Sequence, residues 1–131
     1  MIVISEVPFM KKILVVDDND DMRYTIKEAL EGAGCDYEYI EAESGEVALS
    51  MLKKSKVDLI LLDIMMPGID GWEVAATIKS DYTLKDIPII YLTAKTDSVS
   101  KGMGGLTAED YIEKPFDASH LKKRIEKVIG K

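Results

Sequence analysis

The sequence has very few residues of the types that bind soft metals or form disulfides. Its 131 residues include one cysteine, Cys35, and one histidine, His120. A single cysteine excludes an intramolecular disulfide and favours a reducing compartment, so we expect a cytoplasmic protein. A zinc site needs more sulfur and imidazole ligands than one of each. His120 belongs to an ordinary amphipathic pattern and is interpreted as a surface residue, not as a phosphoryl donor.

Long apolar runs, excess positive charge and a nucleotide-binding loop are also missing. No apolar run approaches the ~20 residues that a membrane span requires, so we expect no membrane insertion. The formal net charge of −7 argues against direct binding to nucleic acid. No GxxxxGK segment is present, and the chain is therefore not expected to bind ATP.

The chain does contain short apolar runs of the length of a strand. Three of them have no alternating polar residues and predict strands that are buried on both faces, over residues 13–16, 59–62 and 87–92. Two weaker strands are predicted over residues 37–42 and 110–114. Strands buried on both faces are typical of a parallel sheet that is covered by helices.

Helical spacing of apolar residues separates these strands. The apolar positions of four helices are, in chain order, Met22, Ile26, Ala29, Leu30 and Ala33; Val47, Ala48, Met51 and Leu52; Val74, Ala75 and Ile78; and Leu121, Ile125, Val128 and Ile129. Ser44 is the predicted N-cap of the second helix. Before the last strand, Gly102, Gly104 and Gly105 each cost a helix about 1 kcal/mol relative to alanine, which predicts a short or frayed helix there.

The alternation of strands and helices predicts an α/β fold of the doubly wound (βα)5 type. Its five-stranded parallel sheet would have right-handed crossovers. We expect residues 1–10 to form an N-terminal extension, because Met10 stands just before the first apolar run, and residues 11–131 to form one domain. In such sheets, ligands bind outside the carboxyl ends of the strands, so functional residues are expected at that edge.

Polar residues follow the predicted strands at that edge. Asp17 and Asp18 come directly after the first run and Asp63 after the third. Thr93 ends the fourth and Lys114 the fifth. Parallel strands would bring three carboxylates, a hydroxyl and an ammonium into one shallow pocket. Three neighbouring acids repel one another, and oxygen ligands with room for water and phosphate oxygens suit Mg²⁺.

Each of these groups also has an ordinary structural interpretation. Asp17 and Asp18 could form a turn and a helix cap, Thr93 could be a cap, and Lys114 could be solvated. The combination favours phosphoryl chemistry instead. A carboxylate beside a divalent cation can attack phosphorus to give an aspartyl phosphate. Mg²⁺, Lys114 and Thr93 could then each serve one phosphoryl oxygen.

Four segments, "ILVVDDN", "DLILLDIMMPGIDGWE", "IPIIYLTAK" and "DYIEKPFD", resemble the receiver domain of two-component response regulators. The similarity to these chemotaxis-regulator-like domains runs from Lys11 to the final helix. It implies a flavodoxin-like strand order 2-1-3-4-5 and a receiver domain over residues 11–131. It also implies that Asp63 accepts a phosphoryl group from a sensor histidine kinase or a phosphotransfer protein.

The same resemblance implies roles for other residues. Asp17, Asp18 and Asp63 would hold Mg²⁺ together with the backbone carbonyl of Met65. Thr93 would be the catalytic and switch hydroxyl, and Lys114 the phosphate-binding lysine.

Tyr111 would be the aromatic switch residue, although an aromatic near a strand end can equally be just half-buried. The Lys114–Pro115 peptide bond would be cis. The fourth helix, fifth strand and fifth helix would carry the signal to an unknown downstream protein target. The family usually has Gly-Ala where this chain has Thr107-Ala108, a departure that falls in the region of the expected fourth helix.

Three other interpretations remain open from the residues. A Mg²⁺-dependent phosphatase with an aspartyl nucleophile generally needs a second acid two residues later, where this chain has Met65, which cannot transfer a proton. A binding module could keep the fold without the switch. The chain could also be a receiver excised from a larger kinase or regulator.

Overall fold

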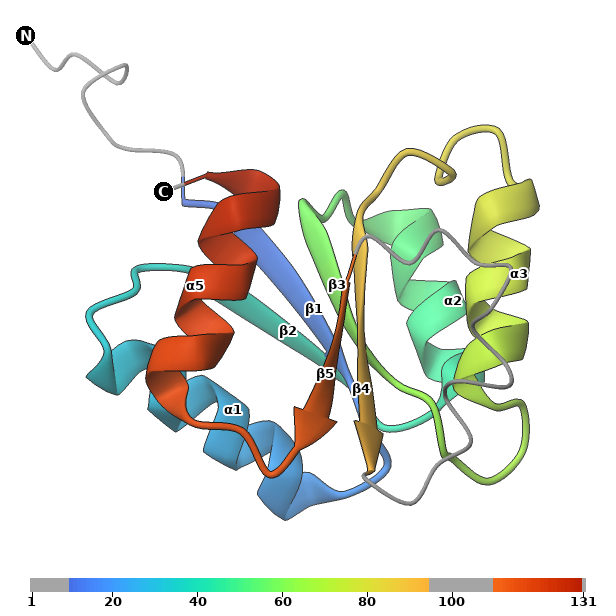
Figure 1. Ribbon diagram of the computed structural model, residues 1–131. Coiled ribbons are helices and arrows are strands. Elements are labelled where there is room, and N and C mark those ends of the chain that lie inside the picture. Colours follow the sequence, from blue (N-terminus) through green and yellow to red (C-terminus); the bar gives the residue numbers. More distant parts are fainter. Residues whose placement is uncertain (1–9, 95–109, 131) are drawn as a thin grey trace, which may run out of the picture.

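The protein, here a computed structural model, is described over residues 10–94 and 110–130 (Figure 1). Five parallel strands form one sheet in the order β2-β1-β3-β4-β5, which confirms the predicted topology. The strands are β1 (Lys12–Val16), β2 (Glu38–Ala42), β3 (Leu59–Asp63), β4 (Ile89–Ala94) and β5 (Asp110–Lys114). The helices are α1 (Asp20–Gly32), α2 (Gly45–Lys54), α3 (Gly71–Ser80) and α5 (Ala118–Ile129). The helix expected before β5 lies outside the described residues.

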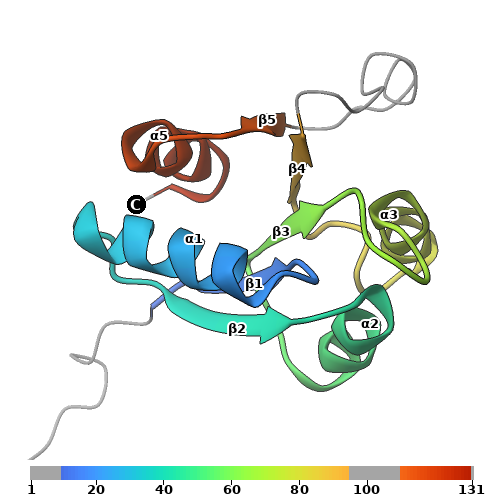
Figure 2. The ribbon, with the colours of Figure 1, turned by 90° about the horizontal axis from the view of Figure 1, so that it is seen from below.

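The helices cover both faces of the sheet, as Figure 2 shows. Helices α1 and α5 lie on one face, where Ile26, Leu30, Leu121 and Ile125 pack in one apolar cluster. Helices α2 and α3 lie on the other face, and their apolar side chains pack in a second cluster with those of the strands. Because successive strand residues point to opposite faces of the sheet, a strand in the centre of this sheet must be apolar on both faces. This is why β3 is buried at all of its positions.

The predicted bounds of β4 were shifted by two residues. Residues 87–92 were predicted, but the strand begins at Ile89 and continues to Ala94. The Ile87 N–H donates to the carbonyl of Leu84 in a turn, at 3.0 Å, and Pro88 has no N–H for the ladder. The apolar run in the sequence therefore begins two residues before the strand.

Side-chain caps begin each of the described helices next to the carboxyl ends of the strands. Asn19 Oδ1 accepts the Met22 N–H of α1, and Ser44 Oγ accepts the Val47 N–H of α2, which confirms the predicted cap. Asp70 caps α3 through a reciprocal pair of hydrogen bonds with Glu73. None of the helices in the described ranges has the length and apolarity that a membrane crossing needs.

Candidate functional site

Strand register brings the predicted residues to one edge of the sheet, which lies at the bottom of Figure 1. Val16 of β1 pairs with Leu62 of β3, so Asp17 and Asp63 follow at neighbouring positions. Asp63 pairs with Leu92 of β4, and Thr93 is the next residue along that strand. Lys114 ends β5 in register with Ala94. The prediction that these strand ends converge is confirmed.

Three carboxylates form what we call the acid cluster: Asp17, Asp18 and Asp63. One carboxylate oxygen from each lies within 4.8 Å of the others. Asp17 is 1% exposed and Asp63 is 5% exposed, whereas Asp18 lies at the surface. Two buried acids and one exposed acid therefore face the same small volume.

Lys114 is the cation that contacts this cluster. Its Nζ donates to Asp17 Oδ2 at 3.2 Å and lies 3.5 Å from Asp63 Oδ1. Counted over residues 10–94 and 110–130, one ammonium against three carboxylates leaves an excess of negative charge in a largely buried place. Such an excess is costly unless a further cation or a proton balances it.

The pKa of Asp63 is raised in these surroundings. Burial, and next the neighbouring Asp17 carboxylate, raise the pKa of Asp63 to about 6. The Lys114 ammonium and the backbone N–H of Met65 oppose this rise only in part. A divalent cation would favour the ionised carboxylate and so remove the need for the proton.

Backbone groups orient the two buried carboxylates. The Asn19 N–H donates to Asp17 Oδ1 at 2.9 Å, and the Met65 N–H donates to Asp63 Oδ1 at a longer 3.3 Å. The side chain of Met65 itself is exposed. Each acid is thus held by the backbone N–H of the residue two positions later, and in Asp63 the Met65 and Lys114 contacts are both to Oδ1.

Gly71 allows α3 to begin directly against the backbone of Asp63. Its N–H donates to the carbonyl of Ile64 at 2.9 Å. A Cβ at Gly71 would lie 2.5 Å from the Asp63 carbonyl oxygen and 2.7 Å from Ile64 Cα, closer than real Cβ atoms approach backbone. This close approach appears only in three dimensions.

Thr93 is fully buried at the end of β4, where its Oγ1 donates to the carbonyl of Ala94 at 3.2 Å. Its position in the register puts it at the same edge as the acid cluster. The Lys114–Pro115 peptide bond is cis, as the family resemblance implied.

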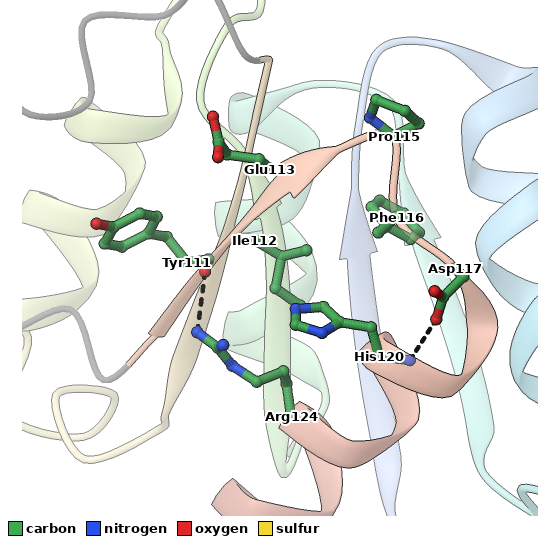
Figure 3. A pocket seen from close by; sticks show the side chains of 8 residues that line it. All are labelled: Tyr111, Ile112, Glu113, Pro115, Phe116, Asp117, His120 and Arg124. Carbon is green, nitrogen blue, oxygen red and sulfur yellow. Dashed lines mark hydrogen bonds between the residues drawn. The ribbon is translucent and has the colours of Figure 1, made fainter.

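Tyr111 lies elsewhere, three residues before Lys114 in β5 and in register with Tyr91. It is 45% exposed and lines a hollow of about 580 Å³ between β5 and α5 (Figure 3). Arg124 reaches back from α5 across this hollow, and its Nη2 donates to the Tyr111 carbonyl at 3.1 Å. His120, also exposed, lines the same hollow, which agrees with its interpretation as a surface residue.

One residue of this edge was missed by the sequence analysis. Arg23, in the first turn of α1, has a side chain that is only 12% exposed and contacts the backbone of Asp17. The only sequence signal was its spacing of three residues from Asp20, which is common on helices and does not indicate a site.

Known proteins resemble the chain in both sequence and structure. The family model described as "Response regulator receiver domain" matches residues 13–126. The phosphate regulon transcriptional regulatory protein PhoB of Pseudomonas aeruginosa is 46% identical over 120 residues, which are 91% of this chain and 52% of that protein. The alkaline phosphatase synthesis transcriptional regulatory protein PhoP of Bacillus subtilis is 38% identical over 120 residues, 91% of this chain and 48% of that protein. The chain thus spans about half the length of these curated relatives.

Solved structures agree with the fold. Chemotaxis response regulator CheY4 of Vibrio cholerae matches with a TM-score of 0.79 and 31% identity over 92% of this chain and 99% of that chain. Response regulator TrrA of Thermotoga maritima, solved in complex with Mg²⁺ and BeF, matches with a TM-score of 0.79 and 40% identity. That match covers 91% of this chain and 99% of TrrA. The chain therefore belongs to the response regulator receiver domains, the signalling domains of two-component systems.

Proposed function

We propose that this receiver domain accepts a phosphoryl group on Asp63 in a Mg²⁺-dependent reaction. The observation that carries the proposal is the acid cluster at the carboxyl edge of the sheet, with Lys114 in contact with two of its three members. The donor would be the phosphohistidine of a sensor histidine kinase or a phosphotransfer protein. The complex of TrrA with Mg²⁺ and BeF supports the proposal by analogy.

The donor set of the acid cluster fits a small divalent cation. It offers three carboxylates with oxygens close enough to share one ion, and it contains no sulfur or imidazole ligand. Asp17, Asp18 and Asp63 would hold Mg²⁺, with the Met65 backbone carbonyl as a further ligand. Bound there, Mg²⁺ would neutralise charge on the phosphoryl oxygens and keep Asp63 ionised.

Asp63 is the proposed nucleophile. One of its carboxylate oxygens forms a bond to phosphorus while the phosphorus–nitrogen bond of the donor breaks, and the electron pair of that bond returns to the imidazole. Lys114 would transfer its hydrogen bond from the carboxylates to a phosphoryl oxygen. The Thr93 hydroxyl would donate to another phosphoryl oxygen in place of the Ala94 carbonyl. These residues would promote the formation and the hydrolysis of the domain's own phosphoryl group and act on no separate substrate.

We further propose the division of the chain and its signalling route. Residues 1–10 would be an extension and residues 11–131 the receiver domain. Phosphorylation would change the surface of the expected fourth helix, β5 and α5, with Tyr111 as a switch, and a downstream protein would bind that surface. The net charge of −7 supports a domain without direct nucleic acid contacts, and the single cysteine supports the cytoplasm as its location.

Incubation with Mg²⁺ and acetyl phosphate tests the phosphorylation proposal. Intact mass spectrometry should show one added phosphoryl group on the wild type and none on Asp63→Asn. Asp58→Asn is the matched control, because Asp58 is an exposed acid just before β3, at the opposite edge of the sheet. This variant should be phosphorylated like the wild type. A wild-type chain that stays unmodified and also fails to bind beryllofluoride would contradict the proposal.

A further inference from the structure

Arg23 contacts the same residue as Lys114, but from the backbone side. Its Nη1 donates to the carbonyl of Asp17 at 2.6 Å, and its Nε donates to Glu41 Oε1 in β2 at 2.9 Å. Its Nη2 also donates to Asp20 Oδ1 at the start of α1. One guanidinium therefore joins the end of β1, the first turn of α1 and the edge strand β2. We call Arg23 and its three partners, Asp17, Asp20 and Glu41, the arginine cluster.

These contacts fix the backbone from which the exposed acid Asp18 projects. Asp17 is held at its N–H by the Ala42 carbonyl at 3.1 Å, at its side chain by Asn19 and Lys114, and at its carbonyl by Arg23. The carbonyl of Asp17 belongs to the peptide plane that leads to Asp18, so its orientation sets where the Asp18 side chain begins. Within the described parts of the chain, no hydrogen bond holds the Asp18 carboxylate itself.

The charges around Arg23 indicate that it acts on the acid cluster through geometry. Two carboxylates, those of Asp20 and Glu41, pair with the guanidinium directly. Neither belongs to the acid cluster. The positive charge of Arg23 is therefore balanced locally. Arg23 affects the acid cluster by fixing the orientation of the Asp17 carbonyl.

We propose that Arg23 is a positioning residue for the Mg²⁺ ligands, which holds the Asp17–Asp18 peptide so that both carboxylates face one ion. This role rests on the proposed function, because it concerns the same metal site. Arg23 itself does not touch the metal. Residues that orient metal ligands in this way typically contribute a factor of about 10 to 100 to metal affinity.

Two substitutions separate geometry from charge. Arg23→Lys keeps the positive charge, but a single ammonium cannot donate along the three directions of the guanidinium. Arg23→Gln also removes the charge. Removing a cation near an acidic site should by Coulomb's law strengthen Mg²⁺ binding, whereas loss of positioning should weaken it. The sign of the change therefore distinguishes the two roles.

Isothermal titration calorimetry with MgCl₂ alone measures the effect, at a temperature where circular dichroism shows every variant to be folded. We expect the Mg²⁺ dissociation constant to rise about tenfold in Arg23→Lys and at least as much in Arg23→Gln. Lys27→Gln is the matched control. Lys27 lies one turn further along α1 and makes no ion pair within the described residues, so its removal changes the charge without breaking an ion pair.

A kinetic measurement gives an independent readout. The rate of phosphorylation by acetyl phosphate should be reduced in Arg23→Lys at Mg²⁺ concentrations below saturation and should recover at saturating Mg²⁺. A role in stability alone would leave both the dissociation constant and this Mg²⁺ dependence unchanged in the folded protein. Dissociation constants for Arg23→Lys and Arg23→Gln within about twofold of wild type, or below it, would overturn the role of Arg23 and leave the proposed function standing. A wild type that binds neither Mg²⁺ nor beryllofluoride would instead remove the proposed function.

Discussion

The acid cluster and the arginine cluster meet at Asp17 but differ in how completely their charges are satisfied. In the arginine cluster, a guanidinium donates to two carboxylates and to a backbone carbonyl. In the acid cluster, as far as the described residues show, one ammonium contacts two of the three carboxylates. Burial, and next the Asp17 carboxylate, raise the pKa of Asp63 to about 6. The satisfied cluster can serve as a scaffold, whereas the unsatisfied one is suited to a further cation.

The comparison also explains why two acidic groups with similar sequence surroundings differ. Asp20 and Asp17 both lie in the "DDND" segment, but Asp20 is an exposed partner of Arg23 and Asp17 is almost fully buried. Burial of Asp17 is tolerated because backbone and Lys114 donors surround it. Position relative to the sheet edge, not residue type, decides which acid belongs to the site.

Removing the cation that, among the described residues, contacts two members of the acid cluster should have the largest effect. In Lys114→Met, phosphorylation by acetyl phosphate at saturating Mg²⁺ should slow about 100-fold or more, because one donor to the developing charge is lost. Mg²⁺ binding should become tighter in the same variant, because the competing ammonium is gone. Calorimetry and a mass-spectrometric time course measure the two quantities.

Lys122→Met is the control for this prediction. Lys122 of α5 donates to the carbonyl of Ala33 and lies outside the acid cluster, so the same change of charge should alter neither quantity appreciably. Weaker Mg²⁺ binding in Lys114→Met would show that Lys114 orders the carboxylates more than it competes for them.

The burial of Asp63 beside the Asp17 carboxylate should also be visible as a stability change with pH. The pKa of Asp63 is raised from 3.8 to about 6 in the folded chain. Between these pH values the folded state keeps a proton that the unfolded state has released, so the free energy of unfolding falls as the pH rises through this window. Two pKa units correspond to at most about 3 kcal/mol.

Urea unfolding in EDTA measures how far the free energy of unfolding falls when Asp63 loses its proton. Asp63→Asn should therefore be more stable than the wild type at pH 7, by up to about 3 kcal/mol, and the difference should shrink towards pH 4. Saturating Mg²⁺ should stabilise the wild type more than the variant. A variant less stable than the wild type at pH 7 in EDTA would mean that the Lys114 ion pair outweighs burial and repulsion.

The contact between α3 and the Asp63 backbone should give a smaller effect. Gly71→Ala places a Cβ against the Asp63 carbonyl oxygen and should lower the free energy of unfolding by about 1 to 3 kcal/mol. Because the displaced backbone carries Asp63, Mg²⁺ affinity should fall as well. Denaturant unfolding and calorimetry report the two changes.

Gly32→Ala is the matched glycine control. A Cβ at Gly32, the last residue of α1, would meet no atom within 4 Å. This variant should change stability by less than about 1 kcal/mol, in the stabilising direction, because alanine has the higher helix propensity. Equal destabilisation by both substitutions would contradict a specific role for Gly71.

The sequence was sufficient to predict most of the edge that carries the site. Asp63 stood out because it ends an apolar run, and Asp17 and Lys114 stood out for the same reason. Strand position predicts convergence because parallel strands share a carboxyl edge. The start of β4 was placed wrongly because Ile87 is apolar for the sake of packing, while its N–H is used in a turn.

Two features could not be predicted in this way. Arg23 acts through hydrogen bonds to a carbonyl and to a carboxylate on another strand, and no local pattern encodes such a meeting. Gly71 is required by the distance between two backbones, which the sequence does not express.

By itself the sequence determined the fold class, the strand order through its family resemblance, and the identity of the acids at the sheet edge. The fold class and the acids follow from periodicity and from chemistry at strand ends, which are local properties, whereas the strand order came from the resemblance alone. Only the tertiary structure decided which charges balance one another, because ion pairing and burial depend on distances between segments far apart in the chain. Those distances left Asp63 with a raised pKa and placed Arg23 against the backbone of Asp17.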